Sequence, residues 1–231
     1  NLYRTSFNDF GLGSVLFNAV NMPQTVPVYD QNGDYFLAPG YLGIEIINPL
    51  QQIANTYNDY RLNKWNGNVG LTANFAKYFS ATARIGFNTT NTKYKSFAMM
   101  VDYGGKVFDV SRSSVFQEKE NFNDYTADAF ISYDQTYNEA HHLIATVGTT
   151  IFQTWGNNLN ATGWDVPNNS WDYADISLAN GLSEAKSTGS WTYDQRRFSL
   201  FARLQYDYKA KYLISAMFRQ DASTKFGPDN A

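Results

Sequence analysis

The chain has no cysteine among its 231 residues, which excludes a disulfide framework, a thiol nucleophile and a Cys-based zinc site within this sequence. Charge is also scarce, because only 17% of the residues are charged and the net charge is −3. A protein that binds nucleic acid needs a dense basic surface to neutralise phosphates. We therefore expect no nucleic-acid partner.

Long hydrophobic runs are missing too. Segments such as Ala98–Val101 are far shorter than the roughly 20 apolar residues that a membrane-spanning helix requires. A helical membrane protein is therefore not expected, whereas a β-barrel stays open, since its strands need only about 9–11 residues of alternating character.

Motifs of catalysis and metal binding are not found. The sequence has no Gly-x-Ser-x-Gly elbow, no His-Glu-x-x-His helix and no phosphate-binding P-loop. The neighbouring residues His141 and His142 would point to opposite faces of a strand and would not chelate a metal together. We predict that the chain is not an enzyme and has no cofactor and no metal site.

What the sequence does contain is alternation of apolar and polar residues, together with 17 Tyr, 17 Phe and 5 Trp. Val69, Leu71 and Ala73 alternate with Asn68, Gly70 and Thr72, and the same pattern resumes after a tight turn at residues 79–87. Such a pattern fits a sheet half-buried in water, or a barrel wall with lipid outside and a polar lumen inside.

The strand-like segments group into three hairpins with connections of two kinds. The connections inside the hairpins are short, and those between hairpins, at about residues 96–121 and 156–190, are long. Outer-membrane barrels sort their connections in this way, with short periplasmic turns and long extracellular loops. The strands are expected at Tyr60–Phe75, Phe79–Lys95, Phe122–Tyr133, His142–Trp155, Trp191–Tyr206 and Tyr212–Asp221.

We therefore predict an all-β fold, in which antiparallel hairpins form part of a transmembrane β-barrel. Residues 1–58 are expected to hold the end of a strand and an extracellular loop region with a short helix that begins near Ser14. Residues 59–231 are expected to supply about six barrel strands. Neither end of the chain resembles a natural terminus, so we expect a mature or excised fragment.

Aromatic residues gather near both ends of the expected strands, as in the interfacial girdles of a barrel, although aromatics favour strands in general. The set near the short turns is Phe75, Tyr78, Phe79, Tyr133, Tyr137, Tyr206, Tyr208 and Tyr212. The set near the long loops is Tyr57, Tyr60, Tyr94, Phe97, Phe122, Trp155, Trp191 and Tyr193.

Three stretches resemble the SusC/RagA family of TonB-dependent outer-membrane transporters of Bacteroidetes. Residues 198–228 are similar to a barrel hairpin that ends in Arg-x-Asp-Gly-Ser-x-x-Phe-Gly, with Ala222 in place of the usual Gly. Residues 16–33 resemble the loop before a barrel strand, and Asn48-Pro49 resembles a recurrent Asn-Pro segment. The resemblance covers nearly the whole chain.

The resemblance implies a bacterial outer-membrane barrel of about 22 strands with a plug inside, in contact with membrane lipid. The plug domain, the TonB box and the remaining barrel would lie outside this chain. The complete protein would import glycans or oligopeptides, together with a SusD-like surface lipoprotein and the TonB complex.

Two groups of residues are candidate functional sites. The first is a long extracellular loop whose rings and amides could contact substrate or a partner, or could pack the loop upon itself: Trp155, Asn157, Asn158, Trp164, Asp165, Trp171 and Tyr173. The second is a lumen-facing set that could line a solute path, pair with the plug or pair across strands: Arg84, Arg197, Arg203, Arg219 and Asp221.

Nutrient import by a SusC-like barrel is the leading hypothesis. The alternative is a secreted, non-catalytic β-sandwich that binds carbohydrate through its Trp-rich loops, and a third is a passive porin-like or structural surface barrel without TonB dependence. Membrane insertion separates the first from the second, because a secreted binding module is soluble without detergent.

Overall fold

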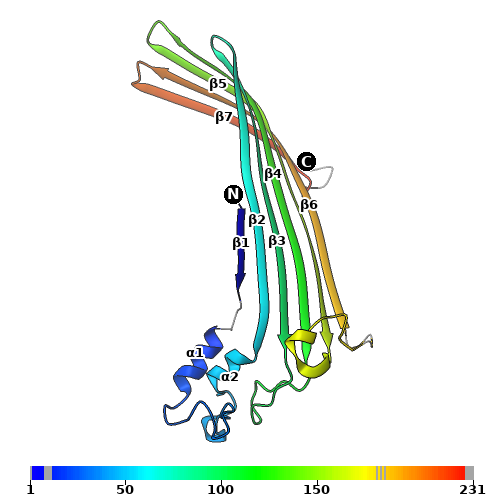
Figure 1. Cartoon of the computed structure of the whole chain (residues 1–231). Coiled ribbons are helices and arrows are strands. Elements are labelled where there is room, and N and C mark those ends of the chain that lie inside the picture. The colour runs from blue at the N-terminus through cyan, green and yellow to red at the C-terminus, as the bar shows by residue number, and fades with distance from the viewer. Residues whose placement is uncertain (1, 8–11, 181, 183, 185, 227–231) are drawn as a thin grey trace.

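The computed structural model describes residues 2–7, 12–180, 182, 184 and 186–226. Seven antiparallel strands form one sheet in which spatial order follows chain order (Figure 1). The strands are β1 (Leu2–Phe7), β2 (Thr56–Ala76), β3 (Phe79–Ala98), β4 (Ser114–Tyr137), β5 (His141–Trp164), β6 (Lys186–Tyr208) and β7 (Tyr212–Ser223). The all-β, antiparallel prediction is confirmed. Gly227 and Pro228 of the family-like motif lie outside the described residues.

The helices lie with the long connections at one end of the sheet, and the short turns lie at the other (Figure 1). They are α1 (Leu12–Asn21), η1 (Gly40–Leu42), α2 (Pro49–Ala54), η2 (Pro167–Asn169) and η3 (Trp171–Tyr173). Helix α1 begins two residues before Ser14, where a short helix was expected. No helix within the described ranges is both long and apolar enough to cross a membrane.

The Asn48-Pro49 segment has a simple structural role at the start of α2. The side-chain oxygen of Asn48 accepts hydrogen bonds from the backbone N–H groups of Leu50, at 3.1 Å, and Gln51, at 3.4 Å. Asn48 is thus the N-cap, and Pro49 occupies a first-turn position where its missing N–H costs no hydrogen bond. The same side chain donates to the carbonyl of Val28 at 2.8 Å, which ties α2 to the preceding loop.

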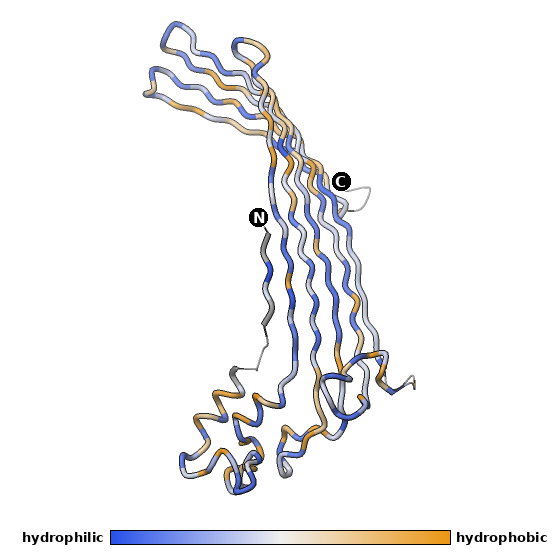
Figure 2. The backbone as a smooth tube through the Cα atoms, in the orientation of Figure 1, coloured by the Kyte–Doolittle hydropathy of each residue, from blue (hydrophilic) through white to orange (hydrophobic). Residues whose placement is uncertain are grey.

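Strand register keeps the two sides of the sheet distinct. Val69 lies opposite Ile85, Ile85 opposite Ala127, and the alignment continues across β5 and β6 to Ile151 and Phe198. Because side chains alternate between the faces of a strand, these residues share one side, here called the apolar face. The opposite side, which carries Arg84, is the polar face. The alternation of colour along each strand in Figure 2 follows this division.

Connection lengths alternate as predicted, with short turns at residues 77–78, 138–140 and 209–211 and long connections at 99–113 and 165–185. The predicted strand ends beside the long loops were wrong. Strand β4 begins at Ser114 instead of Phe122, β5 continues to Trp164 instead of Trp155, and β6 begins at Lys186 instead of Trp191. Residues 156–163 look like a loop because they are rich in Asn and Gly, but ladders with β4 and β6 on both sides hold them extended.

Gly148 shows how tightly the polar face packs across strands. It lies between Phe130 on β4 and Phe201 on β6. A Cβ atom at position 148 would lie 2.5 Å from the Phe130 Cβ atom and 2.7 Å from both the Ala129 carbonyl oxygen and the Phe201 ring. Two rings cover the glycine, an arrangement known to compensate for glycine in strands.

Substitution of Gly148 by Ala should therefore destabilise the wall by about 1–3 kcal/mol, because part of the crowding is against backbone that cannot rotate away. The measurement is the denaturant midpoint of the full-length protein folded in detergent micelles. Gly86→Ala is the matched control, since a Cβ atom there would meet its nearest neighbours only at 3.9 Å. Equal midpoints for the two variants would contradict this packing.

Candidate functional site

A row of polar side chains crosses the polar face from β3 to β7, in direct register: Arg84, Asp128, Thr150, Ser199 and Asp221. The Thr150 hydroxyl donates to the Asp128 carboxylate at 2.7 Å. At the other end of the row, Arg219 donates from Nη2 to the Ser199 hydroxyl at 2.9 Å. Side-chain hydrogen bonds within the row thus join β4 to β5 and β6 to β7.

The register places all of the predicted lumen-facing residues on this polar face. Arg219 forms an ion pair with Asp221, with 2.9 Å between Nε and Oδ1. Arg84 and Arg197 lie over the rings of Phe130 and Phe152, at 5.3 and 5.1 Å from the ring centres. Arg219 and Asp221 of the Arg-x-Asp motif thus pair with each other within β7, and Arg219 also binds Ser199 on the neighbouring strand β6.

Arg203 differs from the other arginines of this set. Like Arg84 and Arg197 it is exposed and forms no ion pair with a described residue, but unlike them it also lies over no ring of the described part of the chain. It lies opposite Thr146 on β5 and Met217 on β7. An exposed guanidinium without such a partner is the member of the set most available to a solute.

The predicted loop site is only partly a loop. Trp155, Asn157, Asn158 and Trp164 all lie within β5, so their placement in a loop was wrong. The cause is the ladder that runs through the Asn- and Gly-rich stretch. Alternation also separates them, because Trp155 and Asn157 lie on the apolar face, whereas Asn158 and Trp164 lie on the polar face.

The remaining candidates, Asp165, Trp171 and Tyr173, do lie in the long connection. Trp171 stacks on Tyr57 with 6.0 Å between ring centres, and the Lys95 ammonium lies 4.2 Å from the Trp171 ring centre. Tyr173 is about half exposed. The prediction that these rings contact a ligand stays a prediction, and for Trp171 the structure shows packing.

This connection folds back over the apolar side of the strand ends. Val166 and Ala174 are buried with Phe97 and Val115, and Tyr57, Met99, Trp171 and Ile176 pack around them. Gly163 allows the approach, since a Cβ atom there would lie 2.6 Å from the Ala179 Cβ atom. The loop therefore covers the outer ends of β2–β5 rather than the polar face.

A cluster that sequence reasoning missed lies on the polar face near the long-loop end. We call Glu118, Glu120, Asn158 and Asn160 the amide–carboxylate cluster. Asn158 is only 3% exposed, and its side-chain amide donates to Glu118 at 2.7 Å and to Glu120 at 3.2 Å. The amide of Asn160 donates to the Asn158 oxygen at 2.8 Å. The spacing of two between Glu118 and Glu120, and between Asn158 and Asn160, could have indicated that each pair shares a face. Both pairs lay outside the expected strands, so the cluster was not predicted.

Aromatic rings surround this cluster on the same face. Phe122 lies 5.6 Å from Trp191, Trp191 stacks on Tyr193 at 5.8 Å, and Tyr94 lies 6.0 Å from Phe116. Gly156 leaves room for the ring of Tyr193, which a Cβ atom would approach to 2.8 Å. Rings beside carboxylates and amides can stack on apolar groups while the polar atoms bind hydroxyl, amide or cationic groups.

These rings also correct the predicted aromatic girdle at the long-loop end. Tyr60, Tyr94, Phe122, Trp191 and Tyr193 lie on the polar face, so they do not form an outward ring. The apolar face instead carries, at that level, Trp65, Phe87, Tyr125 and Trp155. At the short-turn end, the predicted aromatics that lie in strands do share the apolar face: Phe75, Phe79, Tyr133, Tyr137, Tyr206, Tyr208 and Tyr212.

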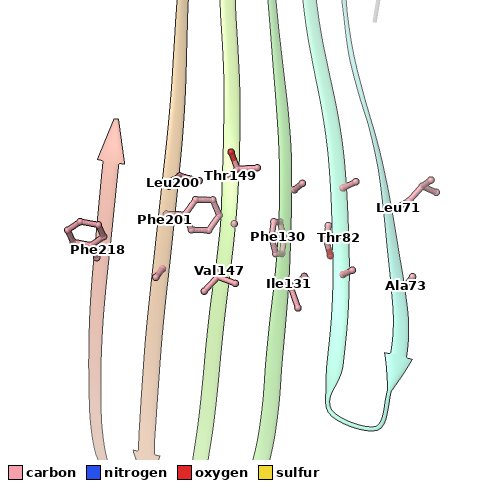
Figure 3. A pocket seen from close by; sticks show the side chains of 15 residues that line it. Leu71, Ala73, Thr82, Phe130, Ile131, Val147, Thr149, Leu200, Phe201 and Phe218 are labelled. Atoms are coloured by element: carbon pink, nitrogen blue, oxygen red, sulfur yellow. The ribbon is translucent and has the colours of Figure 1, made fainter. Parts of the chain in front are cut away.

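A shallow hollow of about 760 Å³ lies mostly on the apolar face, and residues from β2 to β7 line it (Figure 3). Small residues such as Ala83 and Ala129 form its floor, and Leu71, Ile131 and Phe218 stand around them. Few polar atoms converge there, so the hollow is suited to hydrocarbon rather than to a polar ligand. Within the described ranges, no cluster of three or more His, Asp or Glu residues could hold a metal ion.

Asp165 anchors the folded-back loop and gives it a pH dependence. Its carboxylate accepts two hydrogen bonds from Arg112, both at 2.7 Å, and these bonds hold the pKa of Asp165 below its ordinary value. A folded-state pKa below the unfolded value means that this anchor stabilises the loop above about pH 4 and is lost as the pH falls further.

We expect Asp165→Asn to make the loop at 165–180 more sensitive to protease at neutral pH and to remove its acid response. Limited proteolysis of the intact protein between pH 3 and pH 7 measures both effects. Asp172→Asn, in the same loop but without an ion pair among the described residues, is the control. An unchanged cleavage rate in Asp165→Asn would contradict the anchor.

No family model matches the chain. Individual proteins do match it. The chain is 31% identical over 188 residues to TonB-dependent receptor P39 of Formosa agariphila, an alignment that covers 78% of the chain and 17% of the receptor. It is 21% identical over 220 residues to TonB-dependent receptor P3 of the same organism, covering 95% of the chain and 21% of the receptor. The chain thus spans about a fifth of the length of these relatives.

Solved structures share the fold. The structure of the RagAB peptide transporter superposes with a TM-score of 0.75 at 18% identity, over 88% of the chain and 22% of the transporter chain. The RagAB peptide importer in its open-open state also gives 0.75, at 19% identity, over 90% of the chain and 23% of the importer chain. These names describe receptors and importers, not enzymes. In sequence the chain is similar to part of TonB-dependent receptors, and its sheet has the fold of part of the RagAB transporter chain, in agreement with the resemblance that its motifs indicated.

Proposed function

We propose that this chain forms part of the wall of a TonB-dependent importer in the bacterial outer membrane, with its apolar face on lipid and its polar face on the solute path. The observation that carries the proposal is the apolar belt between two aromatic levels. The levels of Phe79 and of Trp65, which pairs with Thr89, are ten residues apart along β3. At about 3.4 Å per residue and a tilt near 40°, the belt is roughly 26 Å tall, close to the apolar band of known barrels.

Exposure supports lipid as the solvent of that belt. Val69, Leu71, Ile85 and Val147 are between 55% and 78% exposed although all lie mid-strand. A continuous exposed apolar surface of this kind is a liability in water and a requirement in a bilayer. A β-sandwich would bury it against a second sheet, whereas the strands in the described part of the chain form a single sheet. The sandwich alternative is therefore disfavoured.

We further propose that the complete protein takes up oligopeptides or glycans, without catalysis and without a cofactor. The similarity to the structure of the RagAB peptide transporter supports peptides. On this chain, the amide–carboxylate cluster, its surrounding rings and Arg203 are the groups suited to touch cargo. The long connections and the helices at the same end are suited to meet a SusD-like lipoprotein, and coupling to the TonB complex would use regions outside this chain.

Replacement of Val69 by Arg tests the orientation of the wall. A cation on the lipid face near mid-belt should cost about 2–4 kcal/mol and strongly reduce the amount of assembled barrel. The matched control is Asn68→Arg, one residue away on the polar face, which should assemble normally. The readout is the fraction of full-length protein that migrates as folded barrel in outer-membrane fractions of the expressing cells.

Two results would contradict the proposal. Normal assembly of Val69→Arg would mean that this face does not meet lipid. Recovery of the wild-type full-length protein as a monodisperse soluble species without detergent would favour a secreted module instead.

The role of the rings on the polar face is tested by Trp191→Ala. Loss of one stacking ring should lower affinity for peptide or glycan cargo roughly twofold to twelvefold, since such ring contacts contribute about 0.5–1.5 kcal/mol. Trp155→Ala removes the same ring at the opposite face and should leave cargo affinity unchanged. Titration of fluorescent cargo against the purified protein measures both, and equal losses in the two variants would refute a cargo role for Trp191.

A further inference from the structure

Beyond the belt, the apolar side of the sheet carries cations in an arrangement that is unfavourable for a sheet alone. Arg61 on β2 pairs with Lys93 on β3, and Lys93 pairs with Lys119 on β4. We call these three residues the cationic row. Like charges directly opposite each other across strands are destabilising. Natural sequences keep such conflicts mainly where a function compensates for them.

The partners available among the described residues do not neutralise this row. Arg61 forms an ion pair with Asp59, at 2.7 Å, and both side chains keep contact with solvent. In the described part of the chain no carboxylate lies within ion-pair distance of Lys93 or Lys119, and both residues are exposed. Lys95, one step further out, lies over the ring of Trp171.

The row borders a hollow of about 470 Å³. Leu159 and Ala161 of β5 lie on its floor, and Ile176 of the folded-back loop is its outer wall. The charged groups that line it are Arg61, Lys93, Lys95 and Lys119 against Asp59 and Glu118, and the side chain of Glu118 belongs to the polar face. The hollow is therefore cationic and much larger than a single phosphate.

Between the row and the belt lies a line of amides in register: Asn63, Asn91, Asn121 and Asn157. Asn121 donates to the Asn157 oxygen at 2.8 Å, and Arg4 of β1 adds a further cation by donating to Asn63 at 2.8 Å. Moving outward along the apolar side, the order is hydrocarbon belt, aromatic level, amides and cations. Arg61 lies four residues beyond Trp65, which for the same rise and tilt is roughly 10 Å outside the aromatic level.

We infer that the cationic row and the amide line bind the phosphorylated sugar headgroup of a glycolipid in the outer leaflet. The cationic row would form ion pairs with the phosphates, and the amide line would form hydrogen bonds with the sugar hydroxyls. The acyl chains would then lie along the apolar belt. Position relative to the belt favours this occupant, because the headgroup of a lipid against the wall would reach this level. The inference rests on the proposed orientation of the wall.

The test uses full-length protein purified in detergent and bis-phosphorylated lipid A as the probe. The variant is Arg61→Gln/Lys93→Gln/Lys119→Gln. Since each basic residue near an anionic headgroup contributes about fivefold, the variant should bind lipid A at least tenfold more weakly. The control is Lys77→Gln/Lys209→Gln/Lys211→Gln, which removes the same charge in the short turns at the opposite end of the strands and should bind as wild type.

A single substitution gives a second readout, in which the shift of the unfolding temperature should change sign when lipid A is added. Lys93 lies between Arg61 and Lys119, so Lys93→Gln should raise the unfolding temperature in lipid-free detergent, because it relieves repulsion. In saturating lipid A the same variant should unfold below wild type, because it loses part of the stabilisation by ligand. A merely structural lysine would shift both temperatures in the same direction.

The sources of phosphate are distinguished by two further probes. Dephosphorylated lipid A should bind wild type and the triple variant equally weakly, and inorganic phosphate at millimolar concentration should not displace lipid A. Unchanged affinity of the triple variant, equal loss in the control, or full displacement by inorganic phosphate would each overturn the inference. If the proposed function itself fails, the wild-type protein is soluble without detergent, whereas failure of this inference alone leaves a membrane-inserted barrel with no preference for lipid A.

Discussion

The rest of the structure depends on one constraint: the backbone ladder from β2 to β6 runs without a break in register from the short turns to the long loops. The one shift, between Asn74 and Ala76, lies beside a turn. Because alternation is not reset along the ladder, odd or even position within a strand decides a residue's face: odd positions of β2–β5 and even positions of β6 lie on the apolar face. Val69 and Lys93 therefore share one side of the wall, and Arg84 and Trp191 share the other, although each pair is far apart along the strands.

Much of this arrangement could be predicted from the sequence, because it depends on local alternation and on connection length. The apolar faces and the side of Arg84, Arg219 and Asp221 follow from a period of two, and the sorting of short and long connections follows from the spacing between the alternating segments. The strand ends did not follow. Residues such as Asn157 and Gly163 have low strand propensity, and only pairing with two neighbouring strands holds them extended.

The candidate site was harder to predict than the fold, for a physical reason that Trp171 and Asn158 illustrate. A tryptophan in a polar loop looks like a ligand contact, but the position of Trp171 depends on Tyr57, which is more than a hundred residues earlier in the chain. Asn158 looked like a loop residue, yet it is buried between two glutamates of the neighbouring strand. Long-range packing assigned both roles, and the alternation gives no information about it.

The most direct test of the account is the solvent that each face of β3 meets in the complete protein. Single cysteines at positions 81 to 88, each carrying a nitroxide spin label, would be compared in bilayers for collision with oxygen, which concentrates in lipid, and with a water-soluble nickel chelate. The account predicts that odd positions favour oxygen and even positions favour nickel, with a strict period of two. Equal nickel accessibility at Ile85 and Arg84, or no alternation at all, would contradict a wall with lipid on one side and a solute path on the other.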